Sequence, residues 1–377
     1  MRRQEKLFSA DSEMKTEHYK RIKFHIHRMT AVICSGLLVF ASGVCCQGVS
    51  VQAADKSGRG TLLRVQPRKT KKQDYQLKDY ANELKRREDT YKISVDQAEE
   101  LLQGSEESVS VRGDWIASKE QMRALKKELK SLLKDADGMW SIYVKDLQSR
   151  VSFSINNKEM YAASLIKLFV MEKCFADYQE IIANDMKTTG GKKDSTDDVE
   201  TLLEGMIEVS DNGYFNELVK LQNEDGDFKA GAEEINGYLE TQGYTDTGVY
   251  HTLHPSDSEY EWNSDERNHT SVEDCGFLLE RIYDGDCVSE EASAKMMEFL
   301  LNQQLTEKIP AGVPEKGDAM CANKTGETDS DHHDAAIVFG SKKDYVLCIM
   351  SSEWEDSSEA VMTIQEISRT VYEMLNK

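Results

Sequence analysis

The sequence lacks an excess of positive charge. Its 47 Lys and Arg residues are outnumbered by 68 Asp and Glu residues, which gives a formal net charge of −21 at pH 7. Basic residues gather mainly near the N-terminus, before any region that is patterned like a folded domain. Because a chain of this charge repels a phosphate backbone, we exclude nucleic acid as a partner.

Closely spaced metal ligands and a pattern of paired cysteines are also absent. No His-Glu-x-x-His pattern occurs, and no two of the 8 cysteines have metal-ligand spacing. The cysteines after residue 54 are too scattered for a disulfide framework, so we expect most of them to be buried as small apolar residues. His332 and His333 lie beside Asp331 and Asp334, and we expect them in a loop before a strand. The sequence therefore predicts no metal and no cofactor.

The N-terminal region resembles an export signal. A basic segment runs into an apolar stretch at 29–44, which is short for a membrane span, and small residues precede Ala54. We interpret 1–53 as a signal peptide cleaved after Ala53, with an uncleaved anchor through residues 29–46 as the alternative. Both predict a secreted or extracytoplasmic protein.

Residues 54–113 are polar and charged, with weak helical periodicity, and we interpret them as a spacer. The basic end of this spacer could contact an anionic cell wall or membrane, whereas the alternative is a solvated linker. The patterned domain then spans 114–377.

Apolar periodicity in that domain predicts helices and strands in a definite order. Spacings of three or four predict helices from about 115 to 133, from 163 to about 178, and at the C-terminus. Alternation predicts strands at 139–147 and 151–155, and strand-like runs predict two more at 335–340 and 345–351. The two ends must therefore build one sheet with the helical middle inserted as a second lobe, and the cleft between lobes is the expected site.

Three short motifs carry the chemistry. They are Ser164-Leu165-Ile166-Lys167, Ser210-Asp211-Asn212 and Lys324-Thr325-Gly326. A second Ser-x-x-Lys, from Ser131 to Lys134, lies on a charged amphipathic helix and is interpreted as a chance match. In their order and spacing the three motifs resemble the S-x-x-K, S-D-N and K-T-G elements of class A β-lactamases and penicillin-binding proteins.

This resemblance covers about residues 115–377 and implies a fold class. That class is α/β (α+β) and β-lactamase/transpeptidase-like, with a mainly antiparallel sheet, terminal helices packed on it and an inserted all-helical lobe. The partner it implies is a small-molecule β-lactam or a peptidoglycan stem peptide, and we expect a monomer.

The residue types of the first motif suit acyl transfer. A serine hydroxyl needs a base, and Lys167, three residues after Ser164, projects from the same helical face. Lys167 must be neutral to act, which requires its pKa to be lowered by burial and by a second cation, for which Lys324 is the candidate. The Ser164 N–H at a helix N-terminus can donate to an oxyanion. The alternative for Ser164 is an N-cap beside a surface lysine.

The resemblance implies the remaining roles. Ser210 relays a proton to the leaving nitrogen, and Asn212 holds the amide carbonyl of the substrate. Lys324 and Thr325 hold its carboxylate, and Gly326 is a further substrate-binding residue. Asp211 would be structural. The Glu327 N–H would be the second oxyanion donor, although its acidic side chain departs from the small residue usual there.

Hydrolysis of the acyl-enzyme needs a carboxylate that activates water. The segment from Glu259 to Asn263 resembles the family's E-x-x-L-N with Trp in place of Leu, so we predict that these two residues hold the water. The Arg and Asp that clasp this loop in the family are replaced by Asp257 and Asn268. The sequence therefore predicts β-lactam hydrolysis first. The alternatives are a D-alanyl-D-alanine-type peptidase or penicillin-binding protein, and a tethered β-lactam sensor without turnover.

Overall fold

The computed structural model describes residues 106–190, 195–254, 266–314 and 319–377. The predicted signal segment, 1–53, and all but the end of the predicted spacer lie outside these residues. Helix α4, Glu106–Leu132, begins inside the stretch interpreted as spacer and continues into the predicted first helix. No helix among the described residues is long and apolar enough to cross a membrane.

A five-stranded antiparallel sheet joins the two ends of the domain. Its strand order is β2-β1-β7-β6-β5, with β1 (Met139–Asp146) paired to β7 (Tyr345–Ser352) over eight positions. The other strands are β2 (Ser152–Ile155), β6 (Asp331–Phe339) and β5 (Met320–Glu327). The predicted union of both chain ends in one sheet is confirmed.

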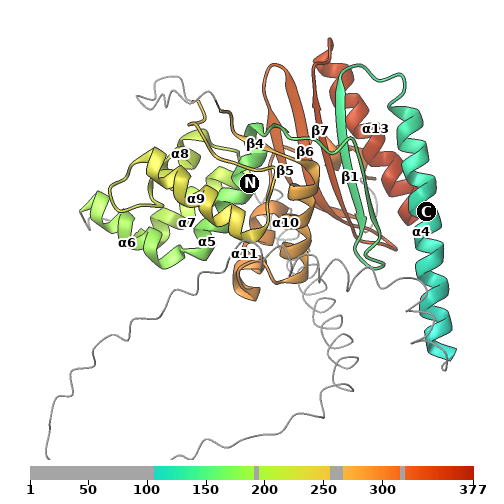
Figure 1. Ribbon diagram of the computed structural model, residues 1–377, viewed down its shortest axis with the longest axis horizontal. Helices are drawn as coiled ribbons and strands as arrows, with labels where there is room; N and C mark the ends of the chain where they lie inside the picture. The colour runs from blue at the N-terminus through green and yellow to red at the C-terminus, as the bar shows by residue number, and fades with distance from the viewer. Residues whose placement is uncertain (1–105, 191–194, 255–265, 315–318) are drawn as a thin grey trace, which may run out of the picture. The chain divides into compact units, whose positions relative to one another are not determined.

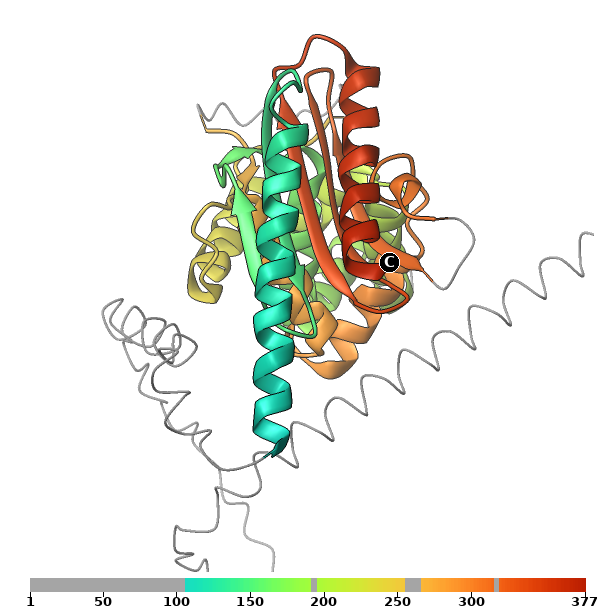
Figure 2. The same cartoon turned by 90° about the vertical axis from the view of Figure 1, so that its right-hand side faces the viewer.

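Two helices cover one face of this sheet, as Figures 1 and 2 show. They are α4 and the C-terminal helix α13, Ser357–Asn376, whose apolar stripes bury Leu125, Leu129, Ile364 and Val371 completely. Each fully buried aliphatic side chain stabilises the fold by about 1.5–3 kcal/mol. The predicted packing of terminal helices on the sheet is therefore confirmed.

The opposite face of the sheet is covered by α10, Val272–Asp284. Gly276 on α10 faces Tyr143 on β1, and a side chain at Gly276 would overlap the tyrosine ring. The absence of a Cβ atom therefore lets α10 lie directly on the sheet.

A helical lobe follows the first two strands. It contains α5 (Ile166–Ala176), α6 (Tyr178–Thr189), α7 (Ser195–Glu208), α8 (Asn212–Lys220) and α9 (Phe228–Gln242), with α11 (Glu290–Leu301) packed on α7 and β5. A one-turn helix, α12 (Ile309–Gly312), precedes β5. The predicted helix at 163–178 is divided at Asp177, where the backbone leaves the helical region before α6 begins. A short pair of strands, β3 (Met160–Tyr161) and β4 (His269–Thr270), lies beside the lobe.

The predicted loop at His332 and His333 is wrong, because both residues lie in β6. Buried partners explain why polar residues occupy a strand. His332 stacks on Trp354 with ring centroids 4.7 Å apart. Nδ1 of His333 accepts the Ser351 N–H at 3.2 Å, so its Nε2 must donate to the Tyr161 carbonyl oxygen, 2.9 Å away. His333 thus ties the sheet to the segment that leads into Ser164.

Candidate active site

Ser164 lies in a 3-10 turn, η1 (Ala163–Leu165), that leads directly into α5. Ala163 has a φ of 44°, a left-handed conformation that is strained for a residue with a Cβ atom. No side chain caps the start of either helical segment, so the structure contradicts the N-cap alternative for Ser164. The turn instead presents the serine toward strand β5.

Strand β5 passes close to this turn at Gly326. A Cβ atom built at Gly326 would lie 3.2 Å from the Ala162 carbonyl oxygen and 3.3 Å from Cβ of Ala163. Such spacing leaves little room for any side chain. Glycine in the Lys324-Thr325-Gly326 motif therefore sets how closely the strand approaches Ser164.

Lys167 lies one turn after Ser164 and is fully buried. Its Nζ is 3.1 Å from Oγ of Ser164 and 3.1 Å from Oγ of Ser210. It also donates to the Ser210 carbonyl oxygen at 2.7 Å and to Oδ1 of Asn212 at 2.6 Å. Burial lowers the pKa of Lys167 to about 7, against the opposing charge of Asp211. Near neutral pH this lysine is therefore divided between its charged and neutral forms.

Ser210, Asp211 and Asn212 form the entry to α8. Ser210 has a φ of 61°, the second left-handed non-glycine residue at this site. Asp211 is the N-cap of α8 and accepts the Tyr214 N–H at 2.8 Å, which fixes the turn. Asn212 spans the site, because its Oδ1 accepts a hydrogen bond from Nζ of Lys167 and its Nδ2 donates to the His254 carbonyl oxygen.

Lys324 reaches Ser210 from the sheet side. Its Nζ donates to Oγ of Ser210 and to the Thr325 carbonyl oxygen, both at 2.9 Å. Burial, the nearby Lys167 and Lys308 lower the pKa of Lys324 well below its ordinary value, although Asp334 opposes them. Ser210 is thus held between two buried lysines.

Asp334 lies on β6, opposite Thr325 of β5, and supports that strand. It is fully buried and accepts Nδ2 of Asn323 at 3.0 Å and the Ile309 N–H at 2.8 Å. Burial raises the pKa of Asp334 to about 6, against the effects of these hydrogen bonds and of Lys308. This buried support has no local sequence motif and was not predicted.

Lys308 is a second residue that the sequence did not reveal. Its Nζ donates to the Gly326 carbonyl oxygen at 3.3 Å and to Oε2 of Glu327 at 2.9 Å. Lys308 is 3% exposed and directly precedes α12. Since it meets the strand through a backbone carbonyl, only the folded sheet brings it to the site.

Glu259, Asn263 and Asp257 lie outside the described residues. Asn268, which stands where the family has an Asp, is described and fully buried. Its Oδ1 accepts the Tyr250 N–H at 2.7 Å and the His251 N–H at 3.1 Å, and its Nδ2 donates to the His251 carbonyl oxygen at 2.9 Å. Asn268 therefore joins the chain on the two sides of 255–265 through backbone hydrogen bonds.

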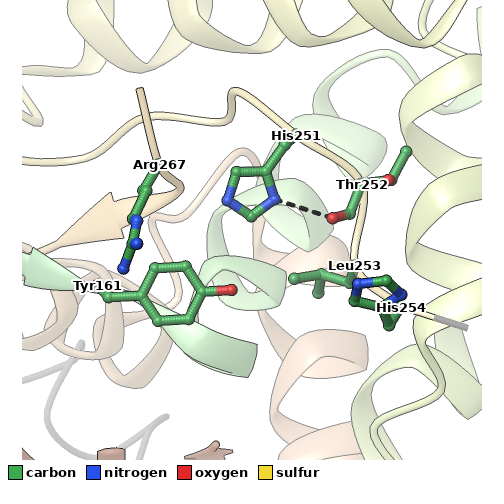
Figure 3. Close-up of a pocket in the computed structure, with 6 residues that line it drawn as sticks. All are labelled: Tyr161, His251, Thr252, Leu253, His254 and Arg267. Carbon is green, nitrogen blue, oxygen red and sulfur yellow. Dashed lines mark hydrogen bonds between the residues drawn. The ribbon is translucent and has the colours of Figure 1, made fainter. Parts of the chain in front are cut away.

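A cavity of about 300 Å³ lies next to that junction. Figure 3 shows its lining, which consists of Tyr161, His251, Thr252, Leu253, His254 and Arg267. The rings of Tyr161 and His251 stack with centroids 6.0 Å apart. Asn212 contacts both His254 and Lys167, and so connects this cavity to the buried lysine beside Ser164.

The structure thus brings together Ser164, Lys167, Ser210, Asn212 and Lys324, with Thr325, Gly326 and Glu327 following on the same strand. The other Ser-x-x-Lys differs in burial, because Ser131 and Lys134 are both exposed at the end of α4. Among the described residues no group of three or more His, Cys, Asp or Glu side chains could hold a metal ion. The five described cysteines are free, and four of them are buried.

Comparisons with known proteins agree with this fold. Solved structures with the same fold include PBP-A (22% identity, TM-score 0.53), with 66% of this chain and 95% of that chain covered. The TLA-1 extended-spectrum β-lactamase is 16% identical with a TM-score of 0.56, and 68% of this chain and 100% of that chain are covered. A point mutant of PBP-A, solved as an acyl-enzyme complex with penicillin G, is 21% identical with a TM-score of 0.53, over 67% and 96% of the two chains.

No curated protein matches the chain. The family described as "Beta-lactamase enzyme family" matches residues 124–375, about two thirds of the 377 residues, including all three motifs. The chain belongs to this β-lactamase enzyme family.

Proposed function

We propose that this protein is a serine hydrolase that opens β-lactams through an acyl-enzyme on Ser164 and releases the product by hydrolysis. One observation carries the proposal: Nζ of Lys167 lies 3.1 Å from Oγ of Ser164 in a fully buried position. A base and a nucleophile at this distance are the minimum that acyl transfer requires.

The partners of Lys167 favour its action as a base. A neutral amine has two N–H groups and one lone pair. The two shortest contacts, to the Ser210 carbonyl oxygen and to Oδ1 of Asn212, are made to atoms that can only accept. Both N–H groups are then occupied, and the lone pair remains for a hydroxyl. Ser164 can donate its proton there.

Acylation then follows in balanced steps. Oγ of Ser164 bonds to the lactam carbonyl carbon as its proton passes to Nζ of Lys167. The N–H groups of Ser164 and Glu327 stabilise the oxyanion. As the carbon–nitrogen bond breaks, Oγ of Ser210 gives its proton to the leaving nitrogen. Lys167, whose Nζ is 3.1 Å from Oγ of Ser210, then gives Ser210 the proton that it took from Ser164, so both groups return to their starting state.

Deacylation in this proposal belongs to Glu259 with Asn263. Glu259 removes a proton from water, the hydroxide adds to the ester carbonyl, and Oγ of Ser164 leaves with a proton returned to it. Thr325 with Lys324 holds the carboxylate of the substrate. The acyl-enzyme of the PBP-A mutant with penicillin G supports a β-lactam as the partner. The segment at 1–53 supports export of the enzyme from the cytoplasm.

Intact-mass spectrometry after incubation with penicillin G tests the proposal, with wild type compared with Glu259→Gln. We expect wild type to return to its free mass while the drug is consumed. Glu259→Gln should accumulate one acyl adduct, because it forms the ester but lacks the base that hydrolyses it. Ser164→Ala should give no adduct.

Other outcomes would redirect the assignment. A stable adduct of the same kind in wild type and in Glu259→Gln would reject hydrolysis. Release of D-alanine from a pentapeptide mimic would then identify a peptidase, and its absence would favour a sensor. An adduct on Ser164→Ala would refute the nucleophile itself.

A further inference from the structure

An acidic residue occupies the rim of the site. Glu327 ends β5 directly after the Lys324-Thr325-Gly326 motif, and its side chain is 64% exposed. In the proposed function its N–H donates to the oxyanion. The carboxylate therefore lies within one side-chain length of the reacting carbonyl group.

This carboxylate is held in a fixed position. Nζ of Lys308, whose side chain is 4% exposed, is 2.9 Å from Oε2 of Glu327. Nδ1 of His332 lies 3.6 Å from the same oxygen. Both contacts are made to Oε2, and the side chain of Glu327 still leaves much of its carboxylate open to solvent.

The two charges of this ion pair differ in exposure. The ammonium group of Lys308 is buried, whereas the carboxylate of Glu327 is exposed at the rim of the site. An incoming molecule therefore approaches the carboxylate more closely than the ammonium group. Partial burial raises the pKa of Glu327, but the hydrogen bond and charge of Lys308, with His332, outweigh it and lower this pKa below its ordinary value. The rim is thus negatively charged at neutral pH.

Other charges near the reacting atoms do not cancel this one. Burial lowers the pKa of Lys167 to about 7, so this lysine carries less than a full positive charge at neutral pH, and burial also lowers the pKa of Lys324. Asp334 is fully buried and faces Asn323 under the strand. The overall charge of −21 adds a field of the same sign as Glu327.

The geometry points to Glu327 as a specificity-determining residue that favours amide substrates carrying a protonated amine near the reacting carbonyl group. This inference rests on the proposed function, since it assumes acyl transfer at Ser164. Its physical basis is the attraction between an ammonium group and the exposed carboxylate of the Lys308–Glu327 pair. Because this pair is open to water, the expected preference is a few-fold, as for other exposed ion pairs.

Ampicillin and benzylpenicillin provide a matched pair of probes, because they differ by one amino group in the acyl side chain. The amine is largely protonated at about pH 7. The measurement is the second-order acylation rate constant for each drug, or kcat/KM where the acyl-enzyme turns over. We expect Glu327→Gln to lower the ratio of ampicillin to benzylpenicillin by about three- to fivefold.

Two further variants serve as controls. Glu366→Gln removes the same charge from an exposed position of α13, on the far side of the sheet, and should leave the ratio unchanged. Glu327→Asp keeps the charge and should retain part of the preference. An unchanged ratio in Glu327→Gln, with both drugs still acylating Ser164, would overturn this inference alone. Failure of both drugs to acylate wild type would overturn the proposed function instead.

Discussion

The inner and outer parts of the site use buried lysines in different ways. Lys167 and Lys324 are fully buried and face serine hydroxyls, whereas Lys308 is 3% exposed and faces a carboxylate. Without a carboxylate in contact, burial favours loss of the proton, and the inner lysines can exchange protons with Ser164 and Ser210. With one in contact, Lys308 forms an ion pair. The partner, rather than the degree of burial, decides whether a lysine moves protons or holds charge.

The largest effect is expected when Lys167, the proposed base, is replaced. Lys167→Met keeps the bulk of the side chain but has no group that can accept the proton of Ser164. We expect the acylation rate to fall by about a thousandfold, within the range known for general bases. Time-resolved intact mass with penicillin G measures it. Lys134→Met, in the exposed Ser-x-x-Lys at the end of α4, is the matched control, and an equal loss there would contradict the assignment.

The pH dependence of acylation gives the next largest effect. The pKa of Lys167 is lowered to about 7, and the neutral form that acts as a base is populated above this pKa. Acylation should therefore rise with pH and level off above about pH 7. At pH 5 it should be roughly a hundredfold slower than on the plateau. A midpoint near 10, the ordinary lysine value, would show that burial does not lower the pKa of Lys167.

Removal of the outer lysine should have the smallest effect. Lys308→Met leaves Glu327 without its buried counter-charge, so the rim becomes more negative. We expect the ratio of ampicillin to benzylpenicillin acylation to rise about twofold, opposite in sign to the effect of Glu327→Gln. Lys295→Met breaks a similar ion pair, with Glu200 in the helical lobe, and should not change the ratio. A fall in Lys308→Met would mean that the lysine itself binds the substrate.

The sequence predicted best what depends on local spacing or strong periodicity. Helical geometry alone brings Lys167 to Ser164, alternating residues predicted β1, and a continuous apolar run predicted β7. Strand β5 was not predicted as a strand, because its polar residues serve the site and its support, which removes the alternation. The β3 and β4 strands are two residues each, too short for any pattern.

Long-range contacts account for the rest of what the sequence did not reveal. Lys308 meets the site through the carbonyl oxygen of Gly326, an atom that every residue has, so no side-chain pattern marks the contact. His332 and His333 looked like loop residues because their partners, Trp354, Ser351 and Tyr161, are distant in sequence. Polar residues in a strand are predictable only when their buried partners are known.

The pairing of β1 with β7 has a consequence for synthesis of the chain. Met139 pairs with Ser352, so strand β1 waits for the central strand β7, which is made more than two hundred residues later. Strand β5, which supports Ser164 at Gly326, also comes after most of the domain has been made. Contacts of such long sequence separation form slowly and late. The nascent chain therefore carries its serine and lysine long before it can place them together, and reactivity appears only when the domain is complete.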